Sequence, residues 1–246
     1  MISASQPRVV ARSSMRTSTE RFEGFADAKA SFFAKLAKNQ SKEWFTAHKA
    51  EYEEGWLAPM KALLGEARAK LDAAFPHVDL GEPRVMRIHR DVRFSKDKSP
   101  YKTWIGGAVP VLAGAKAKMP EMPVAVYVHV AADELFVGSG LYAMDPERLA
   151  RFRKAVLDGR GKELDGILAK LRKKGYTFAA AETLKKVPKG LDPEHPRAEI
   201  LKMKGLVTMF PGAARAELSK RTFLDRVVKP AKDAAPLVEW ITFAVA

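Results

Sequence analysis

Valine occupies every second position of residues 124–131, and this pattern constrains the fold more than any other in the chain. An alternation with a period of two is typical of a β-strand that buries one of its faces. We therefore expect the four valines to face a core, and Tyr127 and His129 to lie on the opposite side. Residues 132–134 can turn the chain into a second strand at 135–137, which predicts a hairpin ended by Gly138-Ser139-Gly140.

Helical patterns flank this hairpin on both sides. Before it, Asp27 and Ser41 are suitable N-caps and Pro59 suits a first helical turn. Because helices collect at the ends and strands in the middle, the sequence predicts an α+β fold with a central antiparallel or mixed sheet flanked by N-terminal and C-terminal helices. The expected helices are residues 27–36, 42–56, 59–75, 146–157, 161–174 and most of the tail from 213, with further strands at 86–94, 176–178 and 206–210.

Composition narrows the class of protein. The chain has 246 residues, 47% of them hydrophobic, and no cysteine, which excludes disulfides, thiolate nucleophiles and cysteine-bound metals. No apolar run is long enough to span a bilayer and the start lacks a secretory signal, so we expect a cytoplasmic protein with no membrane partner. We expect residues 22–246 to form a single domain. Residues 1–21 are predicted to be a disordered basic tail, with an organellar transit peptide as the alternative.

The chain carries a large positive charge. Lysine and arginine number 43 against 29 aspartates and glutamates, which leaves a formal net charge of +14. Such a surplus favours polyanionic partners, although a generally basic composition without any specific ligand explains it equally well. Nucleic acid is a possible partner on charge alone, but no recognised reader motif is present.

The positive charge is densest in residues 84–103, RVMRIHRDVRFSKDKSPYKT. Alternation would place Arg87, His89, Asp91 and Arg93 on one face of an extended segment, followed by a loop that Pro100 stiffens. The two arginines can grip a phosphate or carboxylate with paired hydrogen bonds. Alternatively, Asp91 neutralises both arginines in a structural ion-pair ladder. The candidate anion-binding residues are Arg87, His89, Arg90, Asp91, Arg93, Ser95, Lys96, Lys98, Tyr101 and Lys102.

Secondary candidates lie outside this segment. Tyr127 and His129 can adjoin it if their strands are neighbours. Asp192 and His195 lie in a proline-bracketed loop. The histidine could act as a general base or metal ligand. Alternatively, these side chains only hold the loop together through hydrogen bonds. That spacing matches no standard metal motif, so neither a metal nor another cofactor is predicted. His48, between Trp44 and Tyr52 at helical spacing, is interpreted as part of a packed aromatic face.

Glycine pairs and nucleophile motifs add little. Gly106-Gly107 and the glycines at 138 and 140 are weak phosphate-loop signals, which hairpin ends and close packing explain more often. The chain has neither a Walker loop nor a nucleophile elbow. No catalytic residue is therefore assigned, and the sequence leaves open whether the protein is an enzyme.

Four segments together resemble a known bacterial family, the domain of unknown function 2461. They are residues 39–45 (NQSKEWF), 90–103 (RDVRFSKDKSPYKT), 138–142 (GSGLY) and 188–196 (PKGLDPEHP). The resemblance extends from about residue 22 to the end of the chain. It implies a single α+β domain and no established biochemical activity. Ser139 departs from a glycine in the family pattern, which matters little if its φ is negative.

Three functions remain in view. The first is a pocket for a small anionic or phosphorylated ligand, formed by residues 87–102 with His129 and His195 nearby, and it predicts that these residues converge on one cleft. The second is nucleic-acid binding through the basic surface. The third is a non-enzymatic protein interaction module that uses an exposed aromatic residue such as Trp44 or Trp104.

Overall fold

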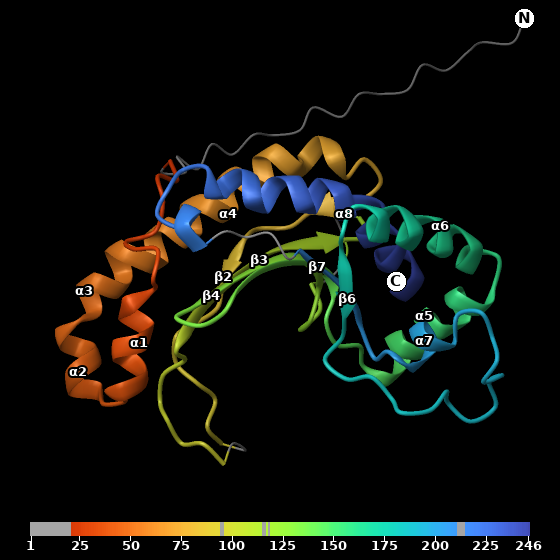
Figure 1. Ribbon diagram of the computed structural model, residues 1–246, viewed down its shortest axis with the longest axis horizontal. Helices are drawn as coiled ribbons and strands as arrows, with labels where there is room; N and C mark the ends of the chain where they lie inside the picture. Colours follow the sequence, from red (N-terminus) through yellow and green to blue (C-terminus); the bar gives the residue numbers. More distant parts are fainter. Residues whose placement is uncertain (1–20, 94–95, 115–116, 118, 211–214) are drawn as a thin grey trace, which may run out of the picture.

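A computed structural model describes residues 21–93, 96–114, 117, 119–210 and 215–246 (Figure 1). The expected N-terminal tail therefore lies almost wholly outside the described residues. Within them, seven strands form one open antiparallel sheet in the order β1-β3-β4-β5-β7-β6, with β2 paired to β3 beside β1. This arrangement confirms the α+β prediction. The strands are β1 (Asp79–Leu80), β2 (Arg84–Val85), β3 (Trp104–Leu112), β4 (Val124–Ala131), β5 (Leu135–Leu141), β6 (Thr177–Ala179) and β7 (Leu206–Phe210).

Most predicted helices are present, with changed boundaries. The Ser41 side chain accepts a hydrogen bond from the Trp44 amide, and Asp145 accepts one from the Arg148 amide, as N-caps do. The helix predicted over residues 42–56 is divided at His48, and a π-helical turn over Glu53–Leu57 precedes the next helix. The helices are α1 (Ser31–Lys38), α2 (Lys42–Ala47), α3 (Lys49–Tyr52), α4 (Ala58–Leu71), α5 (Pro146–Leu157), α6 (Arg160–Lys173), α7 (Ala198–Lys202) and α8 (Phe223–Val245).

One face of the sheet carries two long helices. In Figure 1, α4 and α8 both lie above the central strands. Val126, Val128 and Val130 of β4 are fully buried on this side, as the alternation predicts. Each Å² of apolar surface that this helix–sheet layer removes from water contributes about 25 cal/mol to folding stability. Within the described residues, no helix is both long enough and apolar enough to cross a membrane.

The longest strand, β3, was not predicted. Gly106 and Gly107 lie inside it, so they are not hairpin ends, and close packing is the explanation that holds. A Cβ at Gly107 would lie 2.5 Å from Leu64 Cδ1, so glycine lets α4 approach the sheet closely. Pro110 is tolerated because it lies opposite the gap between β1 and β2, where no strand needs an amide proton from it. Its carbonyl accepts a hydrogen bond from the Gly81 amide at 2.8 Å.

The glycines at 138 and 140 also lie inside a strand, β5, rather than at its end. Gly140 has a φ of +137°, and a Cβ there would collide with the Leu206 carbonyl, so this position requires glycine. Ser139 does not have a positive φ, and its side chain is buried. The departure from the family pattern at Ser139 therefore costs no backbone strain.

The strand predicted over residues 86–94 is wrong. After Val85 the chain leaves the sheet and pairs with itself, through a bridge between His89 and Tyr101. The Arg90 amide bonds to the Pro100 carbonyl at 2.9 Å, and the Lys102 amide bonds to the Ile88 carbonyl at 2.8 Å. The segment therefore projects from the sheet, as the yellow loop at lower left in Figure 1. Arg87, His89, Asp91 and Arg93 do not form one face of a strand.

Candidate functional site

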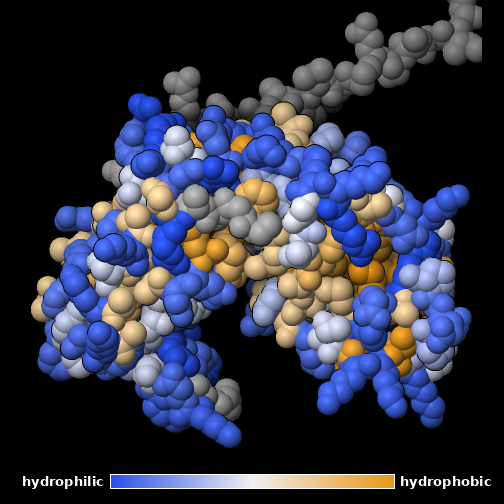
Figure 2. Space-filling model, viewed as in Figure 1, coloured by the Kyte–Doolittle hydropathy of each residue, from blue (hydrophilic) through white to orange (hydrophobic). Residues whose placement is uncertain are grey.

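The sheet face opposite α4 and α8 carries aromatic and polar side chains. In the register of the strands, His129 of β4 lies between Gly106 of β3 and Phe136 of β5. Trp104 and Tyr127 point to the same side, because each is two residues from a member of this row. We call this side of the sheet the open face. Figure 2 shows that the surface is hollowed beneath the sheet, between the projecting loop and the part of the molecule that contains α5 and α7.

The open face holds a compact aromatic cluster. The His129 ring stacks parallel to Phe136 with centroids 4.8 Å apart, and it lies 4.9 Å from the Trp104 ring. Tyr127 lies 5.8 Å from Phe136. A Cβ at Gly106 would collide with the Tyr127 hydroxyl, so glycine at this position allows the tyrosine to lie flat across β3. β3, which the sequence did not predict, therefore positions two members of the cluster. It carries Trp104, and its Gly106 leaves room for Tyr127.

His129 and Tyr127 form an uncharged polar pair. The Tyr127 hydroxyl lies 3.1 Å from His129 Nδ1, and His129 Nε2 lies 3.5 Å from Glu134 Oε2. Burial lowers the pKa of His129, and the negative charges of Glu134 and Asp133 oppose this only partly. Burial also raises the pKa of Tyr127 to about 12, with a smaller contribution from Glu134. Both side chains are therefore neutral near pH 7.

Lys102 connects this cluster to residues 84–103, which we call the basic segment. Its Nζ lies 4.9 Å from the centre of the Trp104 ring and donates a hydrogen bond to the Arg87 carbonyl at 2.9 Å. The pKa of Lys102 is lowered first by burial and then by the positive charge of Arg87. Within the described residues, the Arg87 guanidinium forms no hydrogen bond or ion pair. Two cations thus lie close together, and the charge of Arg87 also contributes to the lowered pKa of Asp91, which is hydrogen-bonded to Arg93.

The two aspartates of the basic segment are already engaged. Asp91 accepts two hydrogen bonds from the Arg93 side chain, at 3.0 and 2.7 Å. Asp97 pairs with Arg90 and accepts bonds from the amide and hydroxyl of Ser99. These bonds lower the pKa of both carboxyl groups. Of the two arginines in the ion-pair alternative, Arg93 is therefore hydrogen-bonded to Asp91, whereas Arg87 affects Asp91 only through its charge.

The other candidates in the basic segment have separate environments. Lys98 donates to the Val92 carbonyl at 2.9 Å, and Lys96 is exposed. Ser95 lies outside the described residues. The Tyr101 ring is buried and stacks on Phe45 at 4.5 Å, and His89 lies 5.2 Å from it.

Tyr101 joins two of the segments that resemble family motifs. Its ring packs on Phe45 of α2, and its amide donates to the Gln40 side chain at 3.0 Å. Residues 39–45 therefore anchor residues 90–103 at the base of the projecting loop. Trp44 and His48 stack at 3.9 Å, which agrees with the interpretation of an aromatic face. The contacts with Phe45 and Gln40 give Tyr101 a structural role.

Asp192 and His195 lie apart from the other candidates. His195 Nδ1 accepts a hydrogen bond from the Arg197 amide at 3.0 Å, and Asp192 accepts one from the Glu194 amide at 2.9 Å. Their loop lies at lower right in Figure 1, across the hollow from the basic segment. Of the predicted residues, the structure brings together Arg87, Lys102, Tyr127 and His129. Trp104, Gly106 and Phe136 complete the set, and none of these three was predicted to belong to it.

The described residues contain no group of three or more histidines, aspartates or glutamates placed to hold a metal ion. A family model described as a conserved hypothetical protein, DUF2461, matches residues 28–240. The chain belongs to this family. The match spans the basic segment, the open face and the loop at 188–196 of this DUF2461 protein, and the description names no activity. No curated protein matches the chain.

Proposed function

We propose that this DUF2461 protein binds a small anionic ligand, carrying a phosphate or carboxylate group, where the basic segment meets the open face. One observation carries the proposal: Lys102 is partly buried beside the like charge of Arg87, and this lowers its pKa. Like charges held close together destabilise a protein, and a bound anion offsets their repulsion. Asp91, whose pKa the charge of Arg87 also lowers, already accepts two side-chain hydrogen bonds from Arg93.

The neighbouring groups decide where the anion lies. Glu134 approaches His129 Nε2 to 3.5 Å, so its negative charge disfavours an anion at that end of the cluster. Lys102 and Arg87 then take the charged group of the ligand. The Trp104 ring and the neutral Tyr127–His129 pair offer an apolar surface and uncharged polar atoms to the rest of it.

Calorimetric titration with pyrophosphate and with citrate tests this proposal. We expect Lys102→Met and Arg87→Met each to weaken binding by about tenfold or more, because hydrogen bonds to charged groups contribute about 1.5–3 kcal/mol. Lys61→Met is the matched control, since Lys61 is exposed on α4, on the other side of the sheet. Circular dichroism verifies that each variant is folded.

Two results would contradict the proposal. One is wild-type protein that binds neither pyrophosphate nor citrate at millimolar concentration. The other is an equal loss of affinity in Lys61→Met, which would indicate a diffuse effect of net charge. A DNA duplex serves as competitor between about 50 and 200 mM salt, a range over which non-specific binding to the phosphate backbone weakens steeply. Tight duplex binding with that steep loss would favour the nucleic-acid alternative.

A further inference from the structure

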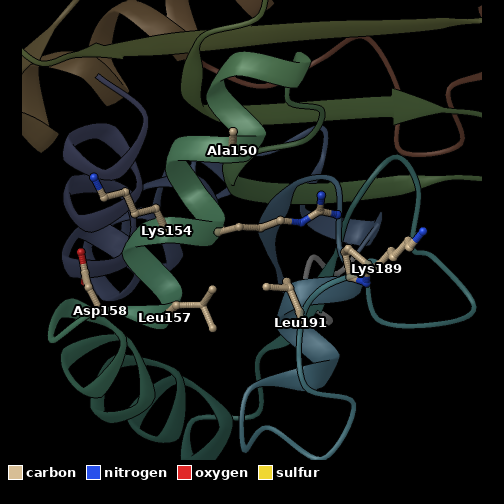
Figure 3. Close-up of a pocket in the computed structure, with 8 residues that line it drawn as sticks. Ala150, Lys154, Leu157, Asp158, Lys189 and Leu191 are labelled. Carbon is tan, nitrogen blue, oxygen red and sulfur yellow. The ribbon is translucent and has the colours of Figure 1, made fainter.

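A cavity of about 570 Å³ lies between α5 and the loop at residues 188–191 (Figure 3). It is separate from the basic segment and the open face, because none of its lining residues belongs to either. On α5, Leu157 follows Arg153 by four residues, so the two side chains lie on one face of the helix. The size falls within the range of pockets that bind small molecules.

The middle of the cavity is apolar. Figure 3 shows the side chains of Leu157 and Leu191 pointing toward each other across the space between α5 and the loop. The Leu191 amide bonds to the Pro188 carbonyl at 3.1 Å, and Gly190 has a φ of +87°, which together form a tight turn. This turn fixes the direction in which the Leu191 side chain points. Leu157 is 40% exposed, so its side chain is accessible from the cavity.

Arg153 supplies a charge with an unmet hydrogen-bonding group. Its Nε donates to the Leu201 carbonyl at 3.2 Å, but its Nη2 is withdrawn from solvent and has no partner among the described residues. Burial lowers the pKa of Arg153. A buried guanidinium nitrogen without an acceptor is costly. Since the described residues supply no acceptor, an ordered water or an anion held in the cavity would supply one.

The rim of the cavity is also positive. Lys189 contributes a second cation, which forms no ion pair within the described part of the chain, whereas Figure 3 shows the Lys154 side chain extending to the other side of α5. Figure 3 shows Lys189 extending away from α5, at the edge of the cavity. The one acid in the lining, Asp158, is engaged by the Arg160 side chain at 3.1 Å and by its amide at 2.9 Å.

We propose that this cavity binds a small apolar monocarboxylate, of the acyl or aromatic class. The carboxylate accepts hydrogen bonds from Arg153, in the paired geometry that guanidinium favours. The hydrocarbon part lies between Leu157 and Leu191. This site is distinct from the one in the proposed function, and its ligand differs in requiring an apolar body.

Calorimetric titration with octanoate tests the proposal, with octanamide as a neutral compound of the same shape. We expect the wild-type protein to bind octanoate and to bind octanamide at least about tenfold more weakly, since a charged acceptor strengthens the bond to Arg153. Arg153→Met keeps the apolar stem and removes the charge, so it should lower octanoate affinity by a similar factor. Leu157→Glu places a carboxylate in the cavity at an exposed position and should do the same without unfolding the protein.

Lys173→Met, at an exposed position of α6, is the matched control and should bind octanoate as the wild type does. Equal binding of octanoate and octanamide would overturn the proposal, because it would indicate an apolar patch without anion recognition. Wild-type affinity in both Arg153→Met and Leu157→Glu would overturn it as well. So would inorganic phosphate that binds as tightly as octanoate, or octanoate that does not bind at millimolar concentration.

Discussion

The two faces of the sheet differ in what their side chains contact. On the covered face, Val126, Val128 and Val130 are fully buried in the layer formed with α4 and α8. On the open face, the same strand carries the half-buried Tyr127 and the buried His129. Figure 2 shows a hollow beneath this side of the sheet. A single alternating strand thus separates the apolar core from the polar residues of the candidate site. Substitutions on the covered face should change stability, and those on the open face should change binding and pH dependence.

The electrostatic character of the faces differs too. Along β3, β4 and β5 the side chains of the covered face are uncharged, and the polar Ser139 is buried among them beside Thr208 of β7, whose hydroxyl bonds to the Ser139 carbonyl at 3.2 Å. The open face holds a histidine with a lowered pKa and ends near Lys102, whose pKa is lowered as well. Lowered pKa values of basic groups are more frequent in functional sites than in structural ones.

The largest expected difference between the faces is in the free energy of unfolding that is lost when a methionine is replaced by alanine. Met60 of α4 is fully buried on the covered face, whereas Met209 of β7 is partly buried on the open face. Met60→Ala should lower the free energy of unfolding by about 2–5 kcal/mol, because it leaves a cavity in the core. Met209→Ala should cost less than half as much, since solvent can fill the space. Urea unfolding followed by circular dichroism measures both, and equal losses would contradict the comparison.

Adjacent glycines of β3 give a smaller contrast. Gly107→Ala would bring its Cβ to 2.5 Å from Leu64 Cδ1 and 3.2 Å from Met60, and overpacking of this kind costs about 1–3 kcal/mol. Gly106→Ala would instead displace the Tyr127 hydroxyl toward the hollow, at a cost of about 0.5–1.5 kcal/mol for the Tyr127–His129 hydrogen bond.

A double-mutant cycle checks the origin of the Gly106 effect. If the Tyr127 hydroxyl is the group displaced, Gly106→Ala should cost less in a Tyr127→Phe background than in the wild type. Unchanged cost in that background would show that the substitution acts elsewhere. Gly107→Ala provides the control, because its cost should not depend on Tyr127.

Local signals explain which elements the sequence predicted. The valine alternation of β4, the Asp145-Pro146 start of α5 and the apolar run of β7 each lie within a few residues, and all three elements are present. β3 was missed because its glycines and proline are unfavourable in an isolated strand. The two glycines are required by distant neighbours, Gly107 by Leu64 of α4 and Gly106 by Tyr127 of β4.

In the basic segment the sequence predicted a strand that is absent, again because strand formation depends on residues distant in the sequence. Residues 86–94 alternate as a strand does, but alternation does not supply a partner, and β3 pairs there with β2 only as far as Val85. The candidate site follows this pattern. Tyr127 and His129 were predicted from the strand that contains them, whereas Phe136 and Gly106 required the register between strands. The Arg87–Lys102 pair required the fold of the projecting segment.

The smallest expected effect is on pH dependence, and it belongs to the open face alone. The pKa of His129 is lower in the folded protein than in the unfolded chain, where it is about 6.5. As pH falls below that value, the unfolded state binds a proton that the folded state resists, so the free energy of unfolding decreases until the pKa of the folded state is reached. One such group changes stability by at most about 1.4 kcal/mol per pH unit.

His129→Phe should flatten this dependence, because phenylalanine keeps the stack on Phe136 and cannot be protonated. Urea unfolding at about pH 7.5 and about pH 5.5, for the wild type and the variant, measures the difference. His77→Gln is the control, since His77 is exposed in the loop before β1 and makes no contact with the open face. A wild-type slope retained in His129→Phe would contradict the prediction. Loss of the slope in His77→Gln would place the pH sensitivity outside the open face, and the distinction between the two faces would then rest on packing alone.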